Sequence, residues 1–251
     1  MKNNLHLLWV LTKTDFKMRY HGSVLGYLWA LLKPFLIFGV LYVVFSVLMR
    51  WDVENYQLYL LLGLMLWNFF AEATMAGLSS LLSKGEIIKK VYFPRILIVI
   101  ASTLSAFMNL VLNMVIFLFF CLLNGFDLHF MMVFLLLYLI VAYVLALGVS
   151  LLLSVLQVKY RDISQIWEVL LQAGFFLTPI FYPLTLVPDK YMFYMFLNPM
   201  TGVIQYSRIL VLDRQFPSMQ GVGFLLIGVL LVFALGWFVF RKMSPNIAEK
   251  L

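Results

Sequence analysis

Ionisable side chains inside long apolar stretches are the residues of this sequence with the clearest chemical potential. Lys33 interrupts the apolar stretch that follows Gly26, and Pro34 comes directly after it. A charge in hydrocarbon is costly, so such a residue commonly faces a water-filled path or a ligand. Lys33 has two interpretations. Either its side chain snorkels back to the nearby lipid headgroups, or it faces a lumen and meets an anionic group of a ligand.

Two acidic residues, Glu72 and Glu168, also lie within apolar stretches. Each is either a proton or ion site, or a carboxylate that supports helix packing or lies at the membrane interface. Glu168 follows Asp162 by about 8 Å of helix, which favours an interfacial position. The sequence leaves both interpretations open for these two residues.

The remaining reactive residue types argue against an enzyme. The three histidines lie in terminal or loop segments, and no apolar stretch pairs a histidine with a serine or cysteine nucleophile. The sequence has no cluster of metal-ligand residues, a single cysteine and no G-x-x-x-x-G-K-[S/T] motif. We therefore expect no catalytic residue, metal site or cofactor in this chain. Any ATP and Mg²⁺ should bind to a separate partner subunit.

The elements that position these residues are predicted to be membrane helices. Hydrophobic residues make up 64% of the chain and charged residues 12%, whereas soluble proteins have about 45–50% and about 25%. The net charge of +7 is better explained by membrane topology than by nucleic-acid binding. No cleavable signal peptide is recognisable at the N-terminus. We expect an all-α integral membrane protein that contacts lipids and binds no nucleic acid.

A spanning helix needs about 20 mostly apolar residues, and six such runs occur. They form a single transmembrane domain over 1–251, with a cytoplasmic segment at 1–26, spans within 27–240 and a cytoplasmic tail at 241–251. The predicted spans are 27–49, 57–82, 96–123, 130–156, 163–182 and 221–240.

The distribution of basic residues predicts the orientation. Thirteen of the 18 Lys and Arg residues lie on one side of the six spans, four lie on the other side, and Lys33 lies within a span. Cytoplasmic loops carry the excess of basic residues. Both termini are therefore predicted to be cytoplasmic. The basic set comes from 1–26, 83–95, 157–162 and 241–251.

Two further segments are predicted to lie at membrane surfaces. Leu5, Trp9, Phe16 and Tyr20 fall on one arc of a helix, which predicts an amphipathic interface helix at the N-terminus. The apolar pieces within 184–220 are too short to span and are separated by a turn at Asn198-Pro199. They predict a helical hairpin between spans five and six, either re-entrant or interfacial.

Several short motifs, in this order and spacing, resemble the ABC exporter permeases that move bacterial surface polysaccharides such as O-antigen, capsule and teichoic acid. The resemblance covers nearly the whole chain, although no single motif is diagnostic. The motifs are MRYHGSVLGYLWALLKP (18–34), IIKKVYFPR (87–95), KYRDI (159–163), TPIFY (178–182), LNP (197–199) and AEKL (248–251).

The resemblance implies a six-span permease subunit of the bacterial cytoplasmic (inner) membrane. It also implies a homodimer that binds two copies of a separate ATP-binding subunit. The substrate would be a polyprenyl-diphosphate-linked polysaccharide or polyol-phosphate polymer.

Two groups of residues are expected to serve this function. Aromatic and basic residues would line a substrate path, because aromatic faces can guide a sugar chain; single aromatics are also common in lipid contact and packing. The segment at 83–95 is predicted to dock on the ATP-binding subunit through an exposed apolar strip of Ile87, Ile88 and Val91 beside Lys89 and Lys90, although it also fits an ordinary basic loop. The path candidates are Arg19, Tyr27, Trp29, Lys33, Phe38, Tyr42, Phe176 and Tyr182, and the coupling candidates are Glu86, Ile87, Ile88, Lys89, Lys90 and Val91.

Two other functions remain possible from the sequence. An ion-coupled carrier would use Glu72 or Glu168 and would work without an ATP-binding partner. A membrane scaffold would transport nothing.

Overall fold

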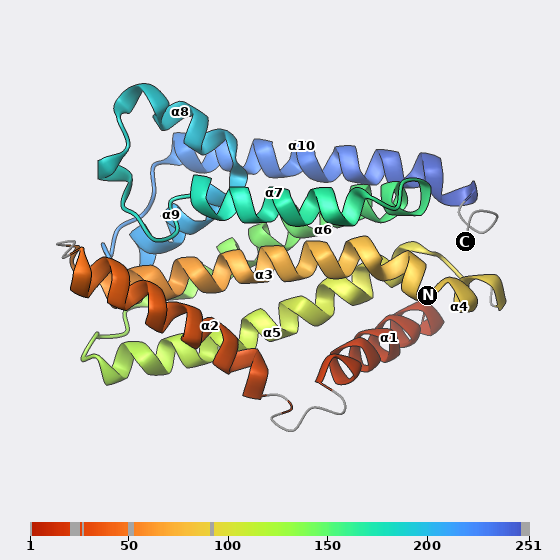
Figure 1. The fold of residues 1–251 in the computed structure, drawn as a ribbon, viewed down its shortest axis with the longest axis horizontal. Coiled ribbons are helices and arrows are strands. Elements are labelled where there is room, and N and C mark those ends of the chain that lie inside the picture. Colours follow the sequence, from red (N-terminus) through yellow and green to blue (C-terminus); the bar gives the residue numbers. More distant parts are fainter. Residues whose placement is uncertain (1, 21–25, 27, 50–52, 91–92, 247–251) are drawn as a thin grey trace.

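The computed structural model describes residues 2–20, 26, 28–49, 53–90 and 93–246. Within these residues the chain is helical and contains no β-strand, as predicted. Figure 1 shows an elongated bundle with α3 at its centre. The α-helices are α1 (Lys2–Tyr20), α2 (Leu28–Tyr42), α3 (Tyr56–Ser83), α4 (Gly85–Lys90), α5 (Ile96–Leu123), α6 (Leu135–Lys159), α7 (Ile163–Leu177), α8 (Asp189–Leu197), α9 (Pro199–Val211) and α10 (Met219–Met243).

Among the described residues, four helices are long and apolar enough to cross a bilayer. They are α3, α5, α10 and α6 together with the 3₁₀ turn Phe130–Phe134 before it, each 25 to 30 residues long. At 1.5 Å per residue they exceed the roughly 30 Å hydrocarbon core. α3 is the most buried of the four, because it packs against both α5 and α6.

The predicted spans at 27–49 and 163–182 form shorter helices. α2 continues past Pro34 into a π-helical segment, Val43–Leu48. α7 ends at Leu177, and Thr178 is extended. Proline disfavours the helical conformation in the residue before it, so Pro179 explains this end. Residues 178–182 therefore form an irregular segment beyond the helix.

Small residues bring the central helices into close contact. A side chain at Gly236 of α10 would collide with the backbone of Gly148 in α6, and one at Gly77 of α3 would collide with Ser150. Small residues allow close approach of helix backbones in membranes. They explain why α6 packs tightly between α3 and α10.

The segment between α7 and α10 folds as two short helices with different environments. Asn198 caps α9 by accepting a hydrogen bond from the Met200 amide, and Pro199 occupies its first turn. α9 is almost wholly buried, whereas α8 has no buried residue. The segment thus forms two consecutive short helices, one inside the protein and the other on its surface.

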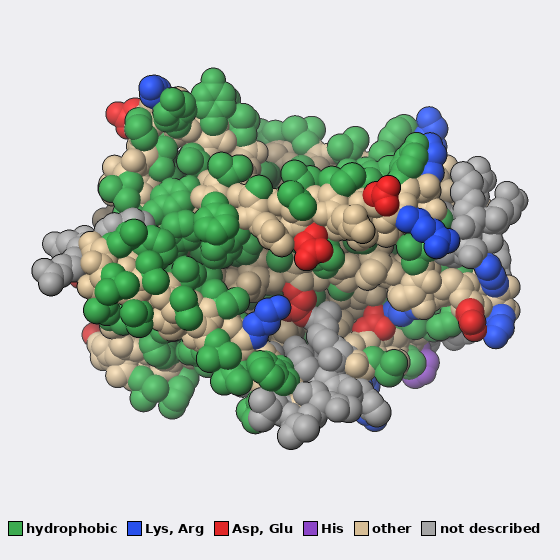
Figure 2. All heavy atoms as spheres, in the orientation of Figure 1, with side chains coloured by type: hydrophobic (Ala, Val, Ile, Leu, Met, Phe, Trp, Pro, Cys, Tyr) green, Lys and Arg blue, Asp and Glu red, His purple; other side chains and the backbone are tan. Residues whose placement is uncertain are grey.

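Basic side chains gather at one end of the molecule. Figure 2 shows Lys and Arg side chains concentrated at the end that carries α4 and the last turn of α10, and hydrophobic side chains gathered at the opposite end of this face. At that end the Arg95 guanidinium donates a hydrogen bond to the Ser244 carbonyl, which joins the start of α5 to the end of α10. α1 packs beside α5 near the same end.

Candidate functional site

A cavity of about 570 Å³ lies between α2, α3 and α5. Its lining combines charged, amide, aromatic and apolar side chains. The described lining residues are Trp29, Lys33, Pro34, Met65, Asn68, Phe69, Ala71, Glu72, Met75, Asn109, Leu110 and Asn113.

The cavity lies midway along the bundle. Glu72 and Asn109 are near the centres of α3 and α5, both long enough to cross a bilayer. Figure 1 shows the first turns of α2 beside the middle of α5 rather than at either of its ends. A carboxylate and amides at this depth would be costly if they faced lipid. These polar side chains line a cavity instead, so they do not face lipid.

Hydrogen bonds join the polar residues on the α3 and α5 walls. The Asn109 Nδ2 group donates to both Glu72 carboxylate oxygens, at 3.3 and 3.2 Å. The Asn113 Nδ2 group donates to the Asn109 backbone carbonyl at 2.9 Å. Within the described part of the chain, Asn109 Oδ1, Asn113 Oδ1 and Asn68 Nδ2 are buried without a hydrogen-bond partner.

The α2 wall holds two of the predicted path residues. Trp29 and Lys33 line the cavity and keep much of their surface exposed, so the cavity communicates with the surface along α2. Of the three ionisable residues singled out in apolar stretches, Lys33 and Glu72 thus share one cavity. Glu168 is exposed on α7 and is not among the described lining residues.

The other predicted path aromatics pack against one another farther along α2 and α7. Phe38 stacks on Tyr42, with ring centroids 5.8 Å apart, and Tyr42 stacks on Tyr56 of α3. Phe176 and Tyr182 both contact Phe181. Tyr27 lies outside the described residues, as does the side chain of Arg19.

Arg208 anchors this aromatic region. Its guanidinium donates to the carbonyls of Tyr59, Pro179 and Ile180 and lies 3.4 Å from the centre of the Tyr59 ring. Only 3% of the residue is exposed. The sequence count placed Arg208 among the four basic residues of the loops opposite to the basic set. The structure corrects this: the arginine lies on buried α9 and binds the irregular segment after α7.

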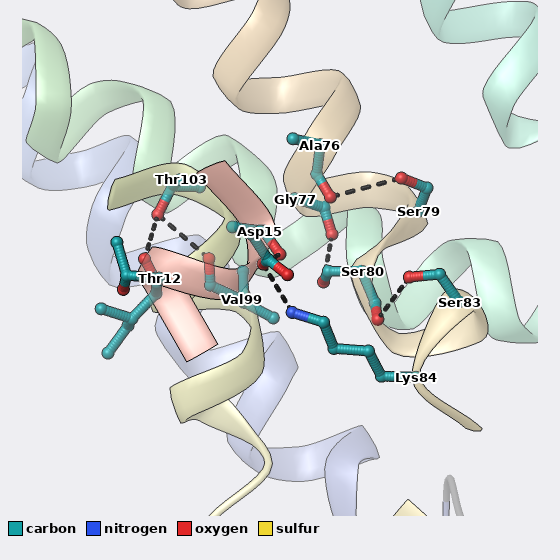
Figure 3. A network of polar contacts seen from close by, with 12 residues as sticks. Thr12, Asp15, Ala76, Gly77, Ser79, Ser80, Ser83, Lys84, Val99 and Thr103 are labelled. Atoms are coloured by element: carbon teal, nitrogen blue, oxygen red, sulfur yellow. Dashed lines mark hydrogen bonds and ion pairs between the residues drawn. The ribbon is translucent and has the colours of Figure 1, made fainter. Parts of the chain in front are cut away.

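A second polar network lies at the basic end, where α1 meets α3 and α5 (Figure 3). The Asp15 carboxylate forms an ion pair with Lys84, 2.5 Å from its Nζ, and accepts a hydrogen bond from Ser102 at 2.9 Å. Lys84 directly precedes α4. The network therefore connects α1 to the helix predicted to dock on a partner.

α4 presents only part of the predicted apolar strip. Ile87 is 44% exposed, but Ile88 is 8% exposed and packs in a cluster with Leu81 and Ile98. Ile88 is therefore turned toward the chain's own core, contrary to the expectation of a continuous exposed strip. Lys89 and the Glu86–Lys90 pair are exposed, and Val91 lies outside the described residues.

The sequence reading overlooked several residues of these sites. The amides Asn68, Asn109 and Asn113, the carboxylate Asp15 and the buried Arg208 were not selected. A signal existed for the amides: Asn68 precedes Glu72 by four positions and Asn109 precedes Asn113 by four, so each pair shares a helix face. Arg208 had no such signal, because its burial depends on how α9 inserts.

Comparison with known proteins agrees with the architecture. A family model described as ABC-2 type transporter matches residues 6–212. Among similar proteins, an O-antigen export system permease protein, RfbA, of Klebsiella pneumoniae is 28% identical, with 100% of this chain and 98% of that protein covered. A Myxococcus xanthus protein of the same name is 26% identical, with 98% and 95% covered. The Escherichia coli polysialic acid transport protein KpsM is 22% identical, with 90% and 89% covered.

The family match spans most of the chain, including the helices that form the cavity and the α1–α4 network. Together with the long apolar helices, it shows that the chain is a multi-pass membrane permease that belongs to the ABC-2 type transporter family.

Proposed function

We propose that this chain is the permease subunit of an ATP-driven exporter that moves a polyprenyl-diphosphate-linked polysaccharide across the bacterial cytoplasmic membrane. The observation that carries the proposal is the full-length similarity to proteins named as O-antigen export permeases, which covers 98–100% of this chain. A polar cavity inside an apolar helical bundle supports a transport role.

The proposed subunit has six spans. α2 with its π-helical extension forms the first span, and α7 with residues 178–182 forms the fifth. Both are short as helices, but protein-buried irregular backbone is tolerated at membrane depth. Arg208 supports this for the fifth, because it supplies hydrogen bonds to the carbonyls of that segment. In the same arrangement α9 is a re-entrant arm and both termini are cytoplasmic.

The working unit is a homodimer with two ATP-binding subunits, which bind ATP and Mg²⁺. Motion of those subunits enters through α4, whose exposed Ile87, Lys89 and Lys90 offer the contact surface. The ion pair between Lys84 and Asp15 transmits this motion from α4 to α1. α1 precedes α2 in the chain, so its displacement shifts the cavity wall that carries Trp29 and Lys33.

The test uses cells that lack this chain and carry it on a plasmid, with surface polysaccharide as the readout. Export should require this chain together with an ATP-binding partner able to hydrolyse ATP. With a hydrolysis-deficient partner, the lipid-linked polymer should accumulate inside the cell. Export that persists with the deficient partner and stops when the proton gradient is dissipated would contradict the proposal and favour an ion-coupled carrier.

A further inference from the structure

The hydrogen bonds inside the cavity fix which atoms are left to meet a ligand. The Nδ2 groups of Asn109 and Asn113 both face acceptors, the Glu72 carboxylate and a backbone carbonyl. This determines the orientation of each amide. Their Oδ1 atoms are therefore acceptors, and both residues are at least nine-tenths buried. A buried acceptor without a donor costs free energy, so this wall favours a ligand that donates hydrogen bonds.

An anionic diphosphate does not fit this wall. A fully ionised phosphate only accepts hydrogen bonds, and the Glu72 carboxylate repels it. Among the described lining residues, the formal charges of Lys33 and Glu72 cancel, which favours a ligand without net charge.

Sugar hydroxyls meet both requirements. Each hydroxyl donates to one partner and accepts from another, so it can pair with Asn109 Oδ1 or Asn113 Oδ1 and accept from Asn68 Nδ2 or the Lys33 ammonium. Trp29 and Phe69 add aromatic faces for the apolar faces of sugar rings. The cavity volume of about 570 Å³ is within the range of about 300–1,000 Å³ typical of small-ligand pockets.

We propose that this cavity is a glycan-binding pocket. It holds a neutral glycosyl unit of the exported polymer through Lys33, Asn68, Asn109 and Asn113, and the Glu72 carboxylate helps to exclude the diphosphate of the lipid carrier. The inference rests on the proposed export function and specifies which part of the substrate occupies this site.

Site-specific photocrosslinking in exporting cells tests the proposal. In a Cys121→Ala background, Ala71→Cys places a small diazirine label on the cavity wall without altering any of the four polar residues. Leu112→Cys is the matched control, because Leu112 lies at similar depth on α5, is exposed and is not a described lining residue. Adducts are measured with radiolabelled sugar. We expect a glycan adduct at Ala71→Cys several-fold above that at Leu112→Cys.

A second variant tests the hydrogen-bonding role. Adding Asn113→Leu to the Ala71→Cys protein removes one acceptor, which should lower the adduct about three- to tenfold. If either change prevents assembly with the ATP-binding subunit, Met75→Cys and Asn109→Leu serve in their place.

Two results would overturn the glycan pocket, and a third would overturn the proposed export function. An Ala71 adduct no larger than the Leu112 adduct, in cells that export normally, would overturn the glycan pocket and leave the export function intact. An equally strong adduct with polyprenyl diphosphate, measured with radiolabelled phosphate in cells that make no glycan, would overturn it in favour of a diphosphate site. If the unmodified chain does not support polysaccharide export, the proposed function itself fails.

Discussion

At the scale of single residues, Arg208 shows how a buried charged side chain can join α9, α3 and the segment after α7. Its guanidinium binds backbone carbonyls of α3 and of the segment after α7. The planar fork serves several acceptors at once, which a lysine cannot do. Gly63 leaves the space for it, because a side chain there would collide with the guanidinium.

We predict that Arg208→Met destabilises the protein by about 3 kcal/mol or more, because several buried charge-assisted hydrogen bonds are lost. Arg208→Lys should recover only part of this loss. The measurement is thermal unfolding of the purified protein in detergent. Arg214→Met is the control, because Arg214 is an exposed arginine near the same end and should leave the unfolding temperature nearly unchanged. Equal effects of the two substitutions would contradict the anchoring role.

Lys33 is the second residue with a testable role. On the cavity wall its ammonium can donate to a ligand, so Lys33→Leu should lower export strongly while the complex still assembles, and Lys33→Arg should keep most activity. The measurement is surface polysaccharide alongside copurification of the ATP-binding subunit. Lys190→Leu, an exposed lysine on α8, is the control. Normal export by Lys33→Leu would leave snorkelling as the explanation.

The candidate site was only partly predictable from the sequence. Lys33 and Glu72 stood out because a charge in an apolar stretch is conspicuous. The asparagines did not, because a neutral amide costs less in a membrane helix. That Lys33 and Glu72 share one cavity depends on where α2 begins relative to α5, and local sequence patterns do not specify this.

At the scale of elements, length decided how well the helices were predicted. α5 coincides with the predicted run at 96–123, and α3 differs from its predicted run by one residue at each end. These helices have mostly apolar sequence over more than seven turns, without an internal proline. The predicted run at 163–182 was partly wrong as a helix, since Pro179 ends it early. α9 was recognised as apolar, but its burial depends on the helices around it.

The ion pair between α1 and the end of α3 gives an element-scale prediction. Asp15 and Lys84 are mostly buried, with 19% and 14% of their side chains exposed. Reversing either charge should weaken ATP-driven export, because a mostly buried charge is left facing a like charge. The double reversal Asp15→Lys with Lys84→Asp should recover part of it. The measurement is polysaccharide export per molecule of ATP hydrolysed.

The Glu86–Lys90 pair is a control for the stability of these variants and not for their export, because Lys90 belongs to the proposed contact surface for the ATP-binding subunit. It is an ion pair within α4 with 89% and 76% of the side chains exposed, and such surface pairs contribute about 0–1 kcal/mol. Its charge reversals should preserve stability. Direct coupling through Asp15 and Lys84 would be contradicted if the double reversal gave no more export per ATP hydrolysed than the more damaging single reversal.

Two neighbouring residues of α4, Ile87 and Ile88, allow docking on the ATP-binding subunit to be tested separately from folding. Ile87→Asp should weaken copurification of the ATP-binding subunit at unchanged thermal stability, because Ile87 is exposed. Ile88→Asp should instead lower stability, because it places a carboxylate in the cluster around Leu81 and Ile98. The measurements on both variants are copurification of the ATP-binding subunit and the thermal unfolding temperature. Loss of partner binding by Ile88→Asp alone, with normal stability, would reverse the assignment.

At the scale of the whole molecule, the arrangement of charge supports one orientation in the membrane. Thirteen basic residues belong to the predicted cytoplasmic segments. Of the four assigned to the opposite side, Arg208 is buried in the protein. Lys84 of the basic set is mostly buried as well, so the predicted asymmetry is essentially unchanged once the fold is known.

The orientation has a direct test in a chain with one cysteine. In a Cys121→Ala background, Lys89→Cys on α4 and Lys190→Cys on α8 each replace an exposed lysine, so both sites are accessible to a thiol reagent. With intact cells, an impermeant maleimide should label Lys190→Cys and not Lys89→Cys. In inverted membrane vesicles the pattern should reverse. In the six-span arrangement three spans lie between α4 and α8, namely α5, α6, and α7 with residues 178–182, so the two sites should face opposite sides of the membrane. Labelling of both sites from one side would contradict the six-span arrangement.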